Sequence, residues 1–255
     1  MNKLIYFLLI NGTLISFTCQ RHQLPTQADT SSYRMDRGQV APENHPTAMI
    51  LAPYKNKLDE QMNIAIGTSA QRLYKQKPES PLGNWMADAL QQQGKKISRK
   101  AISASIQNYG GIRIPEIPEG PVSLGKMYEL MPFDNLLVIV EMTGTQVVQL
   151  FNHIAADGGW PVSSEIQFII NDQRAEKITI DRKVLLSDRK YYIAMPDYIA
   201  NGGSDCDFLI GLPREDTGVL IRDLLIEEVK DLTAAGKNME AKVTGRINWS
   251  DEVDE

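Results

Sequence analysis

Three short segments carry side chains suited to a planar ligand with hydroxyl or phosphate groups. The segments, each beside an expected strand, are NYGGIR (108–113), MPFDN (131–135) and DYIANGGSD (197–205). Arg113 offers a fixed fork of donors for such oxygens, and Asn108 can both donate and accept. Phe133 and Tyr198 present flat faces between which a ring can stack. Together they predict a binding cleft, although each segment alone also fits an ordinary turn with its aromatic ring in the core.

Two glycine pairs accompany these side chains, Gly110–Gly111 and Gly202–Gly203. Without a Cβ atom, glycine lets the main chain approach a ligand closely or adopt a positive φ. The first pair lies between Asn108 and Arg113, so the loop is expected to leave its strand tightly and present the guanidinium.

The chain contains few of the residue patterns that form metal sites or activated nucleophiles. The three histidines, His22, His45 and His153, are scattered, and there is no CxxC pair, GxSxG elbow or phosphate-binding loop. His153 falls on an expected helix and is interpreted as a surface or satisfied histidine. The sequence therefore predicts no catalytic residue, no metal site and no cofactor within the chain.

The N-terminal residues predict export. A single early lysine precedes an apolar run from Leu4 to about Ile15, and small and polar residues lead to Cys19. This layout is typical of a secretory signal and resembles a bacterial lipoprotein signal with lipidation at Cys19; an ordinary cleaved signal is the alternative. We expect a periplasmic or cell-surface lipoprotein that touches the membrane only through its anchor. If Cys19 carries lipid, Cys206 has no intrachain disulfide partner.

Composition places few other limits on the 255-residue chain. The net charge of −5 favours neither nucleic acid nor an anionic membrane surface. The expected organisation is a signal (1–19), a polar and proline-containing tether (20–46), a folded domain (47–250) and an acidic tail (251–255).

The elements that must position the loops are a mixture of helices and strands. Helical spacing of Leu51, Tyr54, Leu58 and Met62 predicts a first amphipathic helix. Further helices are expected at 82–96, ended by Gly94 and two lysines, at 145–156 and at 218–232. Strands are expected at 63–71, 101–107, 136–142, 165–171, 177–180, 190–196 and 245–249. Without strict alternation of strand and helix, this predicts a single α+β domain around a mixed sheet packed by helices.

The ordered motifs NYGGIR, GPVSLGKMYELMPFDNLLVIVEMTGTQV and MPDYIANGGSD resemble the C-terminal, substrate-binding domain of the 5'-nucleotidases, over about residues 48–249. In this family of exported enzymes the domain grips the nucleoside of a nucleotide. A separate metallophosphoesterase domain holds two divalent metal ions and cleaves the phosphate ester. No segment of this chain resembles that second domain.

The resemblance implies roles for individual residues. Asn108 and Arg113 correspond to polar ligands of the substrate, and Phe133 and Tyr198 to the two aromatic walls around the base. Gly110 and Gly111 belong to the first matching motif. Gly202 and Gly203 match a glycine pair that lets a loop close on the ligand.

Two positions depart from the family pattern. Pro78 stands where the family often has an arginine, and Lys77 beside it could supply a point charge. Ser204 stands where an aspartate usually accepts hydrogen bonds from ribose, with Asp205 one residue later. Both changes bear on which ligand is bound.

The resemblance leaves three functions open. The chain can be the substrate-binding half of a 5'-nucleotidase whose metallophosphoesterase is separately encoded. It can instead be a lipoprotein that binds nucleosides or nucleotides without catalysis, or a domain that has lost its ligand and serves structure only.

Overall fold

The computed structural model describes residues 46–250. The expected signal with Cys19, the tether up to residue 45 and the acidic tail at 251–255 lie outside these residues. Within 46–250, no helix has the length and apolar character needed to span a bilayer.

Helices and strands alternate irregularly along the chain, as in an α+β fold. The α-helices are α2 (Pro46–Met62), α3 (Pro81–Ile97), α4 (Leu124–Leu130), α5 (Gly144–Ala156), α6 (Asp197–Ala200) and α7 (Ile221–Ala234). The 3-10 helices are η2 (Tyr109–Gly111), η3 (Gly203–Asp205) and η4 (Asp207–Leu209). The strands are β1 (Ala65–Ser69), β2 (Leu73–Tyr74), β3 (Ala104–Ser105), β4 (Glu116–Ile117), β5 (Gly120–Ser123), β6 (Leu136–Thr143), β7 (Ile166–Asn171), β8 (Arg174–Ile180), β9 (Lys183–Val184), β10 (Lys190–Pro196), β11 (Arg214–Leu220) and β12 (Ile247–Trp249).

A four-stranded mixed sheet in the order β11-β6-β10-β3 lies between two hydrophobic cores. Strand β6 is antiparallel to β10 and β11, whereas β3 runs parallel to β10. Because side chains alternate across a strand, Val138, Val140 and Met142 of β6 face one core and Leu137 and Ile139 face the other. The sheet is thus buried on both faces.

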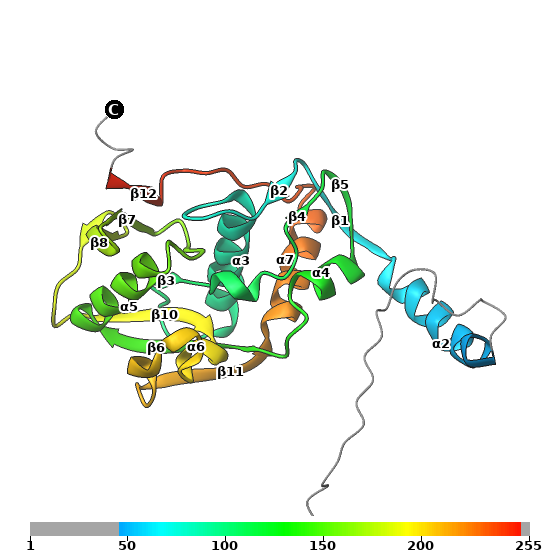
Figure 1. The fold of residues 1–255 in the computed structure, drawn as a ribbon, viewed down its shortest axis with the longest axis horizontal. Coiled ribbons are helices and arrows are strands. Elements are labelled where there is room, and N and C mark those ends of the chain that lie inside the picture. Colours follow the sequence, from blue (N-terminus) through cyan, green and yellow to red (C-terminus); the bar gives the residue numbers. More distant parts are fainter. Residues whose placement is uncertain (1–45, 251–255) are drawn as a thin grey trace, which may run out of the picture. The chain divides into compact units, whose positions relative to one another are not determined.

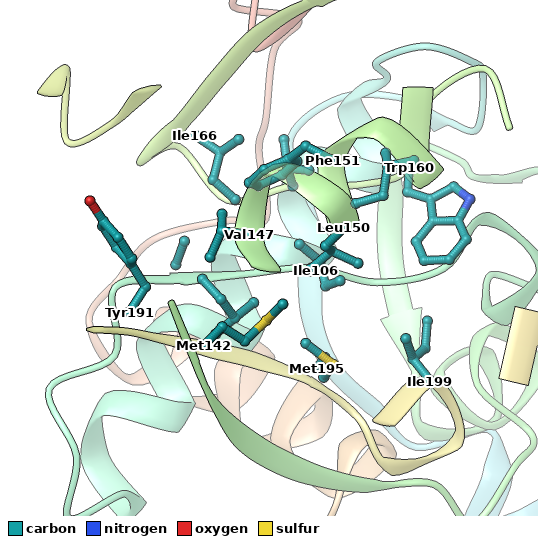
Figure 2. Packing of buried hydrophobic residues seen from close by; sticks show 14 of the residues in the cluster. Ile106, Met142, Val147, Leu150, Phe151, Trp160, Ile166, Tyr191, Met195 and Ile199 are labelled. Atoms are coloured by element: carbon teal, nitrogen blue, oxygen red, sulfur yellow. The ribbon is translucent and has the colours of Figure 1, made fainter. Parts of the chain in front are cut away.

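Helix α5 and a second sheet, β12-β7-β8-β9, build the first core. The helix begins with a capping box in which Thr143 and Gln146 satisfy each other's backbone N–H groups. Its apolar residues Val147, Leu150 and Phe151 recur at helical spacing and are buried (Figure 2). This core therefore holds α5 firmly, including the end of the helix that reaches the site described below.

Helices α3 and α7 cover the opposite face of the central sheet, side by side (Figure 1). A buried polar network ties α3 to the C-terminal segment. Glu79 accepts hydrogen bonds from the Asn84 side chain (2.5 Å) and the Arg246 backbone N–H (2.8 Å). The Arg246 guanidinium donates to both Asp88 carboxylate oxygens (2.8 and 2.6 Å) and to the Val162 carbonyl (2.8 Å).

The expected α+β domain around mixed sheets is confirmed, with three differences. The strands form two four-stranded and two two-stranded sheets within the described residues, rather than one sheet. Gly94 does not end α3, which continues to Ile97; the glycine lies close to Ile102 and Leu137, where a Cβ atom would be crowded. Helix α7 begins only at Ile221, because residues 218–220 belong to β11.

The first helix is present as α2, but its apolar residues are not buried. Leu51, Tyr54 and Leu58 are each more than half exposed. Helical spacing of apolar residues predicted the helix correctly, but not what would cover its apolar face.

Candidate functional site

The three predicted loops meet around one cavity of about 350 Å³, here called the clamp cavity. Its lining residues are Asn108, Gly110, Gly111, Arg113, Phe133, Asn135, Tyr198 and Ser204. The loops follow β3, precede β6 and follow β10, so three neighbouring strands of the central sheet deliver them to the same place.

The first loop is ordered by amide side chains. Asn108 is nearly buried: its side-chain oxygen accepts from Gln107 Nε2 (2.9 Å), and its Nδ2 donates to Ser204 Oγ (3.4 Å). A Cβ atom at Gly111 would collide with the Gln107 and Asn108 side chains, so this position requires glycine. The Asn108–Ser204 hydrogen bond links the first loop to the third.

Arg113 and Phe133 form the exposed edge of the cavity. The Arg113 guanidinium carbon lies 5.5 Å from the centroid of the Phe133 ring, within the range of a cation–π contact. One guanidinium nitrogen donates weakly to the Gly110 carbonyl (3.4 Å), and Arg113 forms no ion pair among residues 46–250. Phe133 is 40% exposed. A cation and an aromatic face are thus available together to a ligand.

Two residues of α7 hold the segment that carries Phe133. Arg222 is 8% exposed, and its guanidinium donates to Asp134 Oδ1 (3.0 Å) and the Phe133 carbonyl (3.4 Å) and lies 4.4 Å from the Tyr128 ring centroid. The Ile221 N–H donates to the carbonyl of Asn135 in the same segment (2.9 Å). These contacts fix the backbone beneath the Phe133 ring.

Tyr198 packs against the glycine pair of the third loop. The methyl group of an alanine at residue 203 would lie 2.5 Å from three Tyr198 ring atoms, so the ring rests directly on the glycine backbone. The Tyr198 hydroxyl accepts from the Ser204 N–H (3.2 Å). Gly202 and Ser204 both have a positive φ, 95° and 56°, which turns the loop back over the ring.

His153 supports the same loop from α5. Its Nε2 lies 2.8 Å from the Ser204 carbonyl oxygen, so the nitrogen carries the proton and donates. The imidazole packs edge-on against Trp160 and Phe208, with centroids 5.5 and 5.7 Å apart. His153 thus has a hydrogen-bond partner, as expected, and this partner, Ser204, lines the clamp cavity.

A cationic group lies beside the first loop. The ammonium groups of Lys75 and Lys77 lie 3.9 and 4.9 Å from the Tyr109 ring centroid, and Lys75 also donates to the Ile112 carbonyl (2.8 Å). Burial, followed by repulsion from Arg113 and Lys77, lowers the pKa of Lys75 below its ordinary value. Lys75 does not line the clamp cavity, but an anion bound between it and Arg113 would relieve that repulsion.

Lys77 does not replace the family's arginine in the clamp cavity. Its ammonium pairs with Asp157 Oδ2 (2.9 Å), and it is not a lining residue. Burial would raise the pKa of Asp157, but hydrogen bonds from Trp160 (2.5 Å) and Lys77 outweigh it and lower this pKa. Neither Pro78 nor Lys77 supplies a charge to the clamp cavity.

Seven of the ten predicted binding residues line the clamp cavity; the other three are Gly202, Gly203 and Asp205. The two glycines shape the loop behind Tyr198, and Asp205 lines a neighbouring cavity with His153 and Trp160. Asn135 also lines the clamp cavity and was not predicted. Its signal was available, because it ends the MPFDN segment two positions after Phe133.

Among residues 46–250, no three His, Cys, Asp or Glu side chains lie together in a way that could hold a metal ion. The two metal ions implied by the resemblance therefore do not fit these residues. Cys206 is buried, and burial, followed by the neighbouring Asp205 and Asp207 carboxylates, raises the pKa of its thiol to about 12. The thiol is protonated at neutral pH and is a poor nucleophile.

Sequence comparison finds a family model described as "5'-nucleotidase, C-terminal domain" over residues 62–209. The trifunctional nucleotide phosphoesterase YfkN of Bacillus subtilis is 27% identical over 226 residues, covering 80% of this chain and 15% of the relative. A 5'-nucleotidase of Vibrio vulnificus is 25% identical, covering 79% of this chain and 37% of the relative. A cell wall protein of Listeria monocytogenes is 27% identical, covering 69% and 24%. These matches span well under half the length of each relative.

Solved structures share the fold. A 5'-nucleotidase precursor from Thermus thermophilus superposes with a TM-score of 0.70 at 25% identity, covering 79% of this chain and 42% of that one. The NAD nucleotidase of Haemophilus influenzae gives a TM-score of 0.61 at 19% identity, covering 80% and 41%.

Proposed function

The chain belongs to the 5'-nucleotidase C-terminal domain family, and we propose that it is the substrate-binding half of a 5'-nucleotidase. The observation that carries this proposal is the convergence of Phe133, Tyr198, Arg113 and Asn108, from three separate segments, on the clamp cavity. The cavity volume of about 350 Å³ lies within the common range for small-molecule sites, about 300–1,000 Å³.

In this proposal the nucleobase stacks on Phe133 and Tyr198, a type of contact worth about 1–3 kcal/mol per base. Both rings are partly exposed, so they have free surface for a ligand to cover. Arg113 has no carboxylate partner among residues 46–250 and would donate to ribose or phosphate oxygens. Asn108 is held on both sides by hydrogen bonds and can contact the ligand without first being ordered.

In this proposal Ser204 lies next to the ribose, at the position where the family usually has an aspartate. Ser204 lines both the clamp cavity and the neighbouring cavity, whereas Asp205 lines only the neighbouring one. A hydroxyl forms weaker hydrogen bonds to ribose than a carboxylate does. We expect the site to grip ribose less tightly than it would with an aspartate at residue 204.

Phosphate-ester cleavage is proposed to reside in a separately encoded metallophosphoesterase that holds the two divalent metal ions. Both proteins would meet outside the cytoplasm, with this chain anchored through lipidated Cys19. Support comes from relatives named 5'-nucleotidases, which are longer than the matched region, and from a relative named a cell wall protein.

Calorimetry with adenosine, AMP and a sugar nucleotide tests the binding role. We expect saturable binding of at least one of them, weakened in Arg113→Ala by about 1.5–3 kcal/mol, the usual contribution of a charge-assisted hydrogen bond. Arg99→Ala is the matched control, since Arg99 is exposed and does not line the clamp cavity. Absence of binding to all three ligands would contradict the proposal.

A second assay tests the role in hydrolysis. AMP hydrolysis is measured for the cognate metallophosphoesterase alone, with this chain, and with its Arg113→Ala variant. The proposal predicts that only the unaltered chain changes the rate or specificity. A chain that binds AMP but leaves both unchanged would instead be a non-catalytic nucleotide-binding protein.

A further inference from the structure

Two segments carry the aromatic walls of the clamp cavity, and one carboxylate oxygen joins them. Asp197 Oδ1 accepts a hydrogen bond from the Leu136 N–H (3.0 Å) and another from the Tyr198 N–H (2.8 Å). Leu136 directly follows Asn135, a lining residue, and lies three positions after Phe133. The oxygen therefore lies between the backbone that carries one ring and the backbone that carries the other.

We infer that Asp197 is a positioning residue that sets the gap between the Phe133 and Tyr198 rings. This inference rests on the proposed function, because it assigns the ring gap a role in holding a nucleobase. Asp197 does not line the clamp cavity and would act only through the two backbone N–H groups it joins.

The Phe133 side of this connection has a fixed counterpart. Arg222 holds the Phe133 carbonyl and Asp134 against α7, and its own guanidinium is almost completely buried. The Phe133 segment is thus attached to α7 on one side and to Asp197 on the other. Without the Asp197 attachment, the start of α6 would be joined to β6 only through the β10 ladder, which ends at the Pro196–Leu137 pair, and Tyr198 could shift relative to a segment that stays in place.

The far end of the Tyr198 ring is held by the third loop, where it packs on Gly203 and its hydroxyl accepts from the Ser204 N–H. Its backbone end depends on the start of α6. Helix α6 is only four residues long, and its N-cap residue, Pro196, makes no side-chain capping hydrogen bond. The ring itself is nearly half exposed. The hydrogen bond from the Tyr198 N–H to Asp197 Oδ1 therefore sets the direction in which the ring leaves α6, between this point and its contacts with the third loop.

Four variants test the inference by calorimetry with AMP. Asp197→Ala should raise the Kd about tenfold, as expected when hydrogen bonds to a charged acceptor are lost. Asp197→Asn keeps an oxygen that can accept both bonds, so its Kd should stay within about threefold of the parent. Asp197→Glu, which displaces the acceptor but keeps the charge, should resemble Asp197→Ala. Asp223→Ala, which removes an exposed acidic residue from the first turn of α7, is the matched control.

A double-mutant cycle separates positioning from general destabilisation. The Phe133→Ala variant lacks one of the two rings, so there is no ring-to-ring gap for Asp197 to fix. In this background, Asp197→Ala should raise the Kd further by less than about threefold. A full tenfold loss in that background would overturn the inference, as would parent-like AMP binding by both Asp197→Ala and Asp197→Glu.

A ligand-free crystal structure of Asp197→Asn and Asp197→Glu distinguishes this inference from the proposed function. Segments 131–136 and 197–204 should keep their spacing in the first variant and move apart in the second. An unchanged gap in Asp197→Glu overturns the inference whether or not AMP binds. Failure of the parent protein to bind adenosine, AMP and a sugar nucleotide instead counts against the proposed function.

Discussion

The close contact between Gly203 and the Tyr198 ring predicts that Gly203→Ala, which adds a single methyl group, disturbs the clamp cavity. An alanine Cβ atom at residue 203 would lie 2.5 Å from Tyr198 Cε1, Cε2 and Cζ, about 0.9 Å short of the 3.4 Å at which ordinary contact begins. The ring or the loop must move by roughly that amount. The loop also loses its hydrogen bond from the Ser204 N–H to the Tyr198 hydroxyl if the ring tilts away.

Forcing a methyl group into a packed contact costs about 1–3 kcal/mol. Because Tyr198 is partly exposed and can yield, we expect Gly203→Ala to weaken AMP binding by about 1–2 kcal/mol, a factor of roughly 5–30 in Kd. Calorimetry measures the affinity, and thermal unfolding measures the stability.

Two further variants isolate the steric cause. Gly110→Ala adds the same methyl group where only Asn108 Nδ2, 3.7 Å away, would be within 4 Å, so the Tm should not change. Gly203→Ala should cost little additional stability in a Tyr198→Ala background, because the ring it strikes is gone. Unchanged AMP affinity and Tm in Gly203→Ala would refute the reasoning.

Three other predictions concern charges and the buried thiol. Arg246→Ala should lower the free energy of unfolding by about 3–5 kcal/mol in urea titrations, because it removes the hydrogen bonds to Asp88 and the Val162 carbonyl and leaves buried Glu79 without its ion-pair partner; a loss below about 1 kcal/mol would contradict this. Cys206, with its pKa raised to about 12, should resist alkylation at pH 8 in the folded protein and react after unfolding, as measured by mass spectrometry of its peptide. Burial, followed by repulsion from Arg113 and Lys77, lowers the pKa of Lys75, and a phosphate bound beside these cations would raise it again. AMP binding should therefore take up more protons than adenosine binding at a pH below the ordinary lysine pKa of about 10.4; calorimetry in buffers of different ionisation enthalpy checks this, and equal uptake for both ligands would count against it.

Much of the site could be predicted because its residues belong to ordered motifs. Phe133, Tyr198 and Arg113 stand in turn-rich segments, each of which alone also fitted an ordinary turn, so their prediction depended on the three motifs taken together and on their order along the chain. The strands were predictable from the local sequence: β6 and β10 are long apolar runs, and the expected strand at 190–196 has the bounds of β10.

The residues that position the clamp were not predictable. Asp197 and Arg222 are ordinary polar residues in the sequence, and their importance comes from partners about 60 and 90 positions away. Strand β11 was missed because its sequence, REDTGVL, is mostly polar; it lies at an edge of the sheet, where charged side chains are common, and all its residues are exposed or half-buried. Gly94 was taken for a helix end because tertiary packing against Ile102 is invisible in a local pattern.

The pairing of β12 with β7 has a consequence for how the chain is made. Strand β12 contributes Ile247–Trp249 to the second sheet, yet it is joined in parallel to β7, some 80 positions earlier in the sequence. The intervening polypeptide and β12 itself must therefore be synthesised before that sheet can be completed. Final assembly of the second sheet thus waits for this late segment.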